Sequence, residues 1–310
     1  MPAKLTMSAS DWLLLVLLSM LWGGAFFSAE IALREIPPLT LALARVGIAA
    51  AILVVYVRAL GLRLPPFGAL WGPLALMAIL NNVAPFTLIF WSQTHITGGL
   101  ASILNATTPL FTIIVAHFAT SDDRITSARL VGLFAGFAGV LTVIGVDALR
   151  ELGVHVAAQF ASLLAALCYA GAGVYGRRLR GHPPAVLSAG MLLISTLIML
   201  PLAAYVDRPW MLPMPSGAAM AATFALAAGS TAAAYLIYFR ILARAGATNI
   251  LLVTFLIPVS AILLGVVFLG ETLEPRHLLG MGVIAIGLAA IDGRSQRWLR
   301  RLFGAASSRA

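Results

Sequence analysis

Two long apolar stretches of the chain contain amide side chains that could hydrogen-bond a small polar molecule. Asn82 lies within residues 69–90 and Asn105 within residues 98–119, and the same stretches also hold Asn81, Thr87, Thr107 and Thr108. Lipid offers no hydrogen bonds, so such groups must face protein or water. They either line a hydrophilic cavity that binds the amino or carboxyl group of a solute, or join neighbouring helices at about 0.6 kcal/mol per bond.

Arg45 is a cation inside a third apolar stretch, residues 39–57. It lies about six residues, or roughly 9 Å, from the nearer end of a helix formed by that stretch. Its guanidinium could bind the carboxylate of a substrate. Alternatively, it pairs with Glu30 or Glu35, or extends to the membrane surface. One buried cation argues against phosphorylated substrates, because a phosphate dianion needs several Lys or Arg side chains.

Aromatic side chains recur at matching depths of separate apolar stretches. Phe86 and Tyr235, for example, are 149 residues apart. Rings with a polar group suit amphipathic organic substrates, although a membrane bundle also packs aromatic residues in its core. The aromatic candidates for the cavity wall are Trp22, Phe86, Tyr169, Tyr235 and Tyr238.

Acidic residues are confined to tails, loops and the ends of apolar stretches. They are Asp11, Glu30, Glu35, Asp122, Asp123, Asp147, Glu151, Asp207, Glu271, Glu274 and Asp292. Proton- or sodium-coupled carriers usually place a carboxylate inside the membrane. The pattern therefore favours a facilitator or an exchanger, although sodium bound by carbonyl groups or a histidine relay would escape this inference.

The histidines give no indication of an enzyme or a metal centre. Four of the five lie in loops or at the ends of apolar stretches, and no H-E-x-x-H motif occurs. We therefore expect no catalytic residue, no metal and no cofactor. A channel is also disfavoured, because it needs a pore-lining ring and usually a symmetric oligomer.

Composition identifies the elements that must hold these side chains. The 310 residues are 61% hydrophobic and 10% charged, with a mean hydropathy of +1.00. These values exclude a soluble enzyme, a disordered chain and a disulfide scaffold, and indicate an all-α membrane protein. Ten apolar runs predict ten transmembrane helices: 12–29, 39–57, 69–90, 98–119, 130–146, 156–175, 185–206, 217–239, 248–269 and 278–291. The first run is too long for the core of a signal peptide, so we expect it to be retained.

The basic residues predict the orientation of this bundle. With a cytoplasmic N-terminus, fifteen Lys and Arg fall on the inner side and four on the outer side. The positive-inside rule then places both termini in the cytoplasm. We expect a multi-pass protein of a bacterial inner membrane. The net charge of +9 is thus explained by topology and implies no nucleic acid. Residues 1–11 form an N-terminal tail, and residues 293–310 form a basic amphipathic tail at the inner leaflet.

The two halves of the chain resemble each other, which predicts a five-helix repeat over residues 12–147 and another over 148–292. Pro109 and Pro258 are 149 residues apart, and five helices per repeat invert the second copy. Transporters commonly bind their substrate between such inverted repeats. The two prolines are candidate hinges of alternating access, or static kinks. Glycines on the fifth and tenth helices indicate packing within a monomer, with a dimer as the alternative.

The sequence resembles the EamA-type, ten-helix members of the drug/metabolite transporter superfamily over residues 12–292. The residues that carry the resemblance are Trp22-Gly23-Gly24-Ala25-Phe26, Arg45, Asn82, Phe86, Thr107–Phe111, Pro258, Gly270-Glu271-Thr272 and the helix that holds Gly280 and Gly287. The resemblance implies a carrier of small metabolites, often in the outward direction, and is strongest to the YddG-type amino-acid exporters.

Together these features predict an exporter of small amphipathic metabolites, foremost aromatic or other hydrophobic amino acids, that works by alternating access. Its partners are the small-molecule substrate and the lipid bilayer. A proton-coupled drug or metabolite efflux carrier is the alternative.

Overall fold

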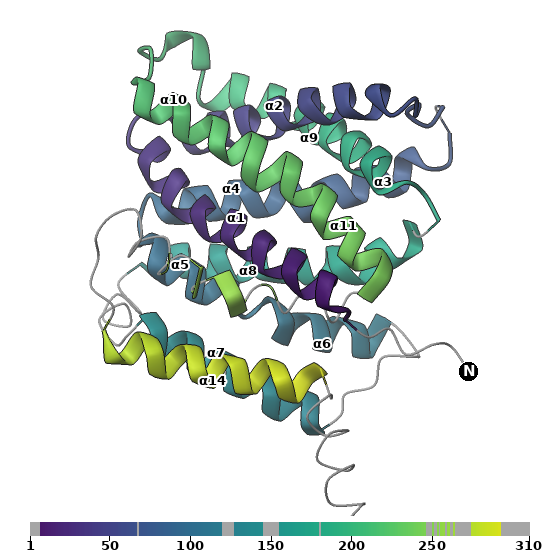
Figure 1. Ribbon diagram of the computed structural model, residues 1–310. Helices are drawn as coiled ribbons and strands as arrows, with labels where there is room; N and C mark the ends of the chain where they lie inside the picture. Colours follow the sequence, from purple (N-terminus) through teal and green to yellow (C-terminus); the bar gives the residue numbers. More distant parts are fainter. Residues whose placement is uncertain are drawn as a thin grey trace, which may run out of the picture.

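The protein is a bundle of helices, as the computed structural model shows (Figure 1). The structure describes residues 7–66, 68–119, 127–144, 155–179, 181–245 and 274–292, and separate positions between 250 and 263. The described residues form helices and connections and contain no strand. Within the described residues, seven helical spans, some made of several consecutive helices, are long and apolar enough to cross a membrane: Ala9–Leu33, Pro38–Ala59, Trp71–Gln93, Leu100–Ala119, Val156–Leu179, Pro184–Val206 and Gly217–Leu242. The predicted all-α membrane fold is confirmed at this level, while ten helices and cytoplasmic termini stay predictions.

The helices follow the apolar runs closely. Long helices are α1 (Ala9–Leu33), α2 (Pro38–Ala59), α7 (Ser127–Ile144), α8 (Val156–Tyr175), α9 (Pro184–Val206) and α14 (Pro275–Asp292). Shorter ones are α3 (Trp71–Ala78), α4 (Ala84–Gln93), α5 (Gly98–Asn105), α6 (Thr108–Ala119), α10 (Gly217–Phe224) and α11 (Ala234–Ala245). The ninth run, 248–269, lies mostly outside the described residues. Pro258 and the basic tail lie wholly outside them.

The fourth apolar run is interrupted rather than continuous, which corrects the expectation of a mid-helix proline. Helix α5 ends at Asn105, and α6 begins at Thr108. Pro109 therefore lies in the first turn of α6, where its missing N–H removes no helical hydrogen bond. The Thr108 hydroxyl donates to the Asn105 backbone carbonyl at 2.6 Å, so this carbonyl at the end of α5 has a hydrogen-bond partner. The membrane span is thus interrupted at residues 106–107, before Pro109.

Two π-helical segments interrupt spans at equivalent places in the two halves. The segment η1 (Ile79–Val83) joins α3 to α4, and η5 (Ala225–Ala233) joins α10 to α11. Moving η1 by the 149-residue repeat gives residues 228–232, which lie within η5. π-Helical turns widen the helix, free backbone groups and occur frequently at functional sites.

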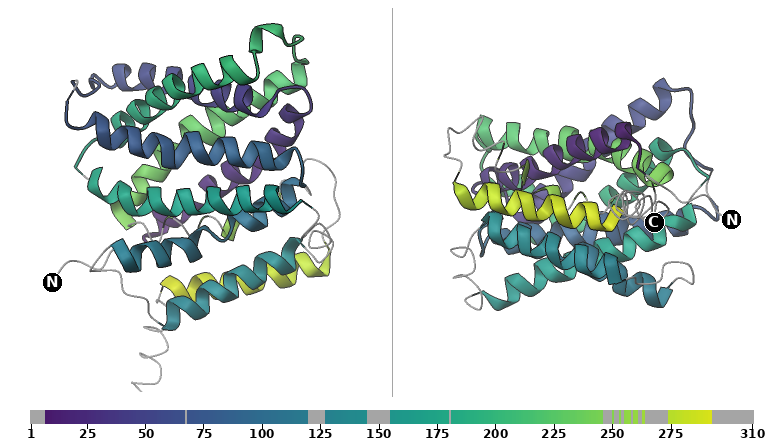
Figure 2. Two further views of the ribbon diagram at one scale, coloured as in Figure 1. Left: turned by 180° about the vertical axis from the view of Figure 1, so that it is seen from behind. Right: turned by 60° about the horizontal axis from the view of Figure 1, so that its bottom comes forward.

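Helices α7 and α14 lie side by side at one edge of the bundle (Figures 1 and 2). A Cβ atom added at Gly287 of α14 would lie 2.6 Å from the Gly136 nitrogen and 2.7 Å from the Gly132 oxygen of α7. The predicted glycine faces therefore pack against each other within one chain. Their small size allows the two backbones to touch.

Candidate functional site

A cavity of about 80 Å³ lies in the middle of the bundle. One water needs roughly 10–15 Å³ on this scale, so the space holds several waters or part of a small organic molecule. Both halves of the chain contribute to its wall. The lining residues are Trp22, Ala25, Phe26, Arg45, Asn81, Phe86, Ile89, Phe90, Gln93, Asn105, Thr108, Tyr169, Tyr235, Tyr238 and Ile257.

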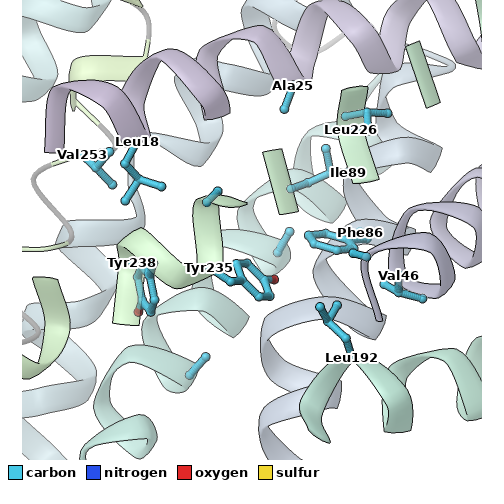
Figure 3. Packing of buried hydrophobic residues seen from close by; sticks show 14 of the residues in the cluster. Leu18, Ala25, Val46, Phe86, Ile89, Leu192, Leu226, Tyr235, Tyr238 and Val253 are labelled. Carbon is cyan, nitrogen blue, oxygen red and sulfur yellow. The ribbon is translucent and has the colours of Figure 1, made fainter. Parts of the chain in front are cut away.

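Most of the residues singled out from the sequence meet at this cavity. Seven of the eight candidates line it, namely Trp22, Arg45, Phe86, Asn105, Tyr169, Tyr235 and Tyr238. Phe86 and Tyr235, which the repeat relates, both line the cavity and appear together in the close-up view (Figure 3). The candidate hinge Pro109 is not part of the wall, and Pro258 lies outside the described residues.

Asn82 lies behind the wall, and its neighbour Asn81 lines the cavity instead. Asn82 is fully buried and donates from Nδ2 to the Ser195 hydroxyl at 2.8 Å. Its Oδ1 accepts the hydroxyl of Tyr235, while Asn81 Nδ2 donates to the same hydroxyl at 3.1 Å. Of the two roles open to Asn82, the structure shows interhelical bonding. Both residues lie on η1, where π-helical winding changes the direction of successive side chains.

Arg45 points into the bundle from α2 and is 7% exposed. Its Nε donates to Thr231 Oγ1 at 2.8 Å, and its guanidinium carbon lies 3.8 Å from the centre of the Phe86 ring. Such a desolvated cation–π contact is worth about 2 kcal/mol. Within the described part of the chain, Thr231 is its one hydrogen-bond partner, so the two terminal nitrogens are left for the cavity.

The alternative partners considered for Arg45 are engaged elsewhere. Glu30 lies 3.8 Å from Arg34. Glu35 accepts the Ser216 backbone N–H at 2.6 Å and the Ser216 hydroxyl at 2.7 Å. The expectation of an ion pair with either acid, or of an extension to the membrane surface, is therefore wrong for this structure.

Two carbonyl oxygens of the wall are buried without a hydrogen-bond partner, namely Gln93 Oε1 and Asn105 Oδ1. The Gln93 amide is oriented by its Nε2, which donates to the Phe26 carbonyl at 3.3 Å. Buried polar groups are rarely left unpaired, because desolvation costs about 1–3 kcal/mol per group. In this structure the two oxygens have almost no accessible surface, so a bound solute reaches them once the amide groups of these two lining residues turn toward the cavity.

The aromatic part of the wall is held by specific contacts. The Trp22 indole nitrogen donates to the Ser230 carbonyl at 3.1 Å, and its ring lies 5.8 Å from that of Tyr238. Because η5 is π-helical, the Ser230 carbonyl is available to this side chain. Trp22 is thereby fixed against the second half of the chain. Within the described residues, no cluster of three potential metal ligands occurs.

Sequence reasoning missed Ala25, Phe26, Ile89, Phe90, Gln93 and Ile257 among the lining residues. Five of these are apolar residues in apolar helices, so nothing in the sequence separates those that face the cavity from those that face lipid. Gln93 is a polar residue at the end of α4, two positions after the apolar run 88–91, and this is a signal that could have been used.

The sequence profile of the EamA-like transporter family matches this chain twice, at residues 10–145 and 156–291. The chain belongs to the EamA-like transporter family. It is 26% identical over 277 residues to the uncharacterized inner membrane transporter YedA of Escherichia coli (strain K12), covering 88% of each chain. It is 27% identical over 278 residues to protein PecM of Dickeya dadantii (strain 3937), covering 87% of this chain and 88% of PecM.

A solved crystal structure shares the fold of this EamA protein. The TM-score is 0.74 at 20% sequence identity, and the match covers 92% of this chain and 98% of the other. Together with its seven long apolar helices, the family match makes this protein a multi-pass membrane transporter.

The two EamA repeats bind each other through related contacts around the cavity. Arg45 on α2 donates to Thr231 on η5. Asn82 on η1 donates to Ser195 on α9. Thr231 and Asn82 are 149 residues apart, and Ser195 and Arg45 are 150 apart. Each π segment is thus joined to the second span of the other repeat. The two contacts differ in that the one made by Arg45 places a cation at the cavity.

Proposed function

We propose that this EamA transporter exports small amphipathic metabolites, with aromatic or other hydrophobic amino acids as its substrate class. The observation that carries the proposal is the cavity between the repeats. Its wall combines aromatic rings with a buried cation at Arg45 and the unpaired amide oxygens of Gln93 and Asn105. Ligand sites are mostly apolar with a few placed polar groups, which suits a molecule with an apolar body and a polar head.

The proposed mechanism is alternating access in a bacterial inner membrane. The location follows the relative named an inner membrane transporter. Two inverted repeats move against each other about a central site. The π segments η1 and η5 and the α5–α6 break before Pro109 are the places in the described helices where bending is easiest. Pro258 is the corresponding candidate in the second repeat.

We further propose that transport is facilitative or by exchange. The described cavity wall contains no Asp or Glu that could carry a proton inside the membrane. Substrate therefore moves down its own gradient or against a second substrate molecule. A coupled drug or metabolite efflux carrier would instead require an imposed proton gradient.

Counterflow in proteoliposomes tests this proposal. We expect saturable uptake of labelled phenylalanine without an ion gradient, accelerated by unlabelled phenylalanine inside. Trp22→Ala should lower this uptake because it removes a cavity wall, whereas Trp71→Ala, at the start of α3 and outside the wall, is the control. Acceleration only by a proton gradient would support the efflux alternative. Uptake equal to that of protein-free liposomes, with folded protein present, would contradict the substrate class.

A further inference from the structure

We infer that the cavity binds its substrate as a zwitterion, with the carboxylate at Arg45 and the ammonium at the side-chain oxygens of Asn105 and Gln93. This inference rests on the proposed function and assigns recognition of the two charges to these residues.

The carboxylate position follows from the state of Arg45. Its Nε is bound to Thr231 and its planar face is covered by Phe86, so only the outer edge of the guanidinium is left to bind a ligand. That edge presents parallel N–H groups, which match the two oxygens of a carboxylate. Among the described residues, no carboxylate neutralises this buried cation. A bound anion would therefore relieve the cost of keeping an unpaired charge away from water.

The ammonium position follows from the two unpaired oxygens. Asn105 is 7% exposed, and its Oδ1 is buried without a hydrogen-bond partner among the described residues. Gln93 presents Oε1 because its Nε2 is engaged by Phe26. An ammonium carries three donors and no acceptor, so it pairs with carbonyl oxygens. The described wall offers it these neutral acceptors and no acid.

Arg45 and Asn105 line the same cavity and lie at similar depth in the bundle, as binding of the two charges of one α-amino acid requires. Arg45 is the eighth residue of α2, and Asn105 is the eighth residue of α5. The start of α5 lies beside the end of α1, since a Cβ atom on Gly98 would lie 3.4 Å from Glu30 Oε2. Both helices thus begin at one end of the bundle, and both side chains lie about 10 Å along their helices. Gln93 lies nearer that end.

Ligands with a single charge fit the arrangement less well. A monocarboxylate would satisfy Arg45 and leave the two amide oxygens buried and unpaired. An amine would satisfy those oxygens and add a second cation near Arg45. Loss of one charged hydrogen bond typically lowers affinity about ten- to a hundredfold. The cavity should therefore discriminate against both kinds of molecule.

Three probes that share one phenyl ring separate these contributions. We would measure inhibition of labelled phenylalanine counterflow by phenylalanine, by 3-phenylpropionate, which lacks the ammonium, and by phenethylamine, which lacks the carboxylate. With wild-type protein, we expect each single-charge probe to inhibit at least tenfold more weakly than phenylalanine. Arg45→Gln should abolish the preference for phenylalanine over phenethylamine. Asn105→Leu should abolish the preference for phenylalanine over 3-phenylpropionate.

Thr112→Val is the matched control, since this buried hydroxyl on α6 bonds the Thr108 carbonyl and does not line the cavity. It should keep both preferences. If Arg45→Gln does not fold, Arg45→Lys retains the charge without the planar fork and should weaken phenylalanine inhibition. Active variants that keep both wild-type preferences would overturn the inference and leave the proposed function standing. Absence of phenylalanine counterflow by wild-type protein would contradict the proposed function, and the inference with it.

Discussion

Tyr235 of the second EamA repeat donates its hydroxyl to Asn82 Oδ1 of the first repeat. The same hydroxyl accepts Asn81 Nδ2 at 3.1 Å, and Asn82 continues to Ser195 on α9 at 2.8 Å. One phenol group thus connects α11 to η1 and, through Asn82, to α9. Its repeat equivalent, Phe86, has no hydroxyl and instead supports the guanidinium of Arg45. The cavity is therefore built asymmetrically on a repeated framework.

Tyr235→Phe should destabilise the protein. The substitution leaves the Asn82 oxygen and the Asn81 amide of a buried network without their partner, at a cost of about 1–3 kcal/mol. Tyr238→Phe is the control, because Tyr238 also lines the cavity but its hydroxyl has no partner among the described residues. Thermal unfolding in detergent compares the two. Equal melting temperatures would mean that the Tyr235–Asn82 bond contributes nothing to the fold.

Gly287→Ala should disrupt the packing of α14 on α7. The added Cβ would lie 2.6 Å from the Gly136 nitrogen, and a backbone atom cannot move aside as a flexible side chain can. Overpacking of this kind costs about 1–3 kcal/mol. Gly282→Ala on the same helix has nothing within 4 Å of its new Cβ and should be neutral, or stabilising by up to about 1 kcal/mol. If both variants changed the unfolding temperature by the same amount relative to wild-type protein, the predicted contact at Gly287 would be contradicted.

The positions of the membrane helices could be predicted from the sequence to within a few residues. Residues 39–57 were predicted as a helix, and α2 spans Pro38–Ala59. A long run of apolar residues is sufficient for this, since lipid requires every backbone group to be bonded internally. The apolar run 98–119 predicts a continuous helix with Pro109 as a hinge or a static kink, so it does not reveal the break between α5 and α6.

The details of the cavity depend on contacts between distant parts of the chain. The acceptor for Arg45 is Thr231, 186 residues away, and nothing near Arg45 in the sequence identifies it. The choice between Asn81 and Asn82 depends on the π segment η1, whose wider turn changes which of two adjacent side chains faces inward. Both segments lie inside long, mostly apolar runs, and nothing in the order of their residues marks where a π turn begins. The repeat spacing and the residue types nevertheless single out Trp22, Phe86 and Tyr235, and the structure places all three at one cavity.

Thr231→Val should destabilise the protein by removing the acceptor of Arg45. A hydrogen bond to a charged group contributes about 1.5–3 kcal/mol, and here its loss leaves a buried guanidinium without its anchor. Thr223→Val is the matched control on α10. Both hydroxyls also donate to a carbonyl of their own helix, Leu226 for Thr231 and Ala219 for Thr223, so the difference isolates the Arg45 contact. A melting temperature no lower than that of Thr223→Val would argue against an anchoring role for Thr231.

Glu35 should give the protein a component of stability that is lost in acid. Its carboxylate ties the α1–α2 connection to Ser216, the residue that caps α10, by accepting the backbone N–H at 2.6 Å and the hydroxyl at 2.7 Å. These bonds, the backbone one first, lower the pKa of Glu35 below its ordinary value of 4.5. The folded state thus binds a proton less readily than the unfolded state, and stability decreases as protons are taken up. The contribution is fully present above about pH 4.5 and is lost as the pH falls through the lowered pKa of the folded state.

Melting temperatures measured across this range for wild-type protein, Glu35→Gln, Ser216→Ala and the double variant would test the assignment. Near neutral pH, wild-type protein should melt above Glu35→Gln, because the neutral amide accepts hydrogen bonds more weakly than the carboxylate. The two curves should converge in acid as Glu35 becomes protonated. Ser216→Ala removes the hydroxyl and keeps the backbone N–H, so part of the pH-dependent difference should remain in that background. Curves for wild-type protein and Glu35→Gln that run parallel at all pH values would show that the Glu35–Ser216 contact is not the source of the acid sensitivity.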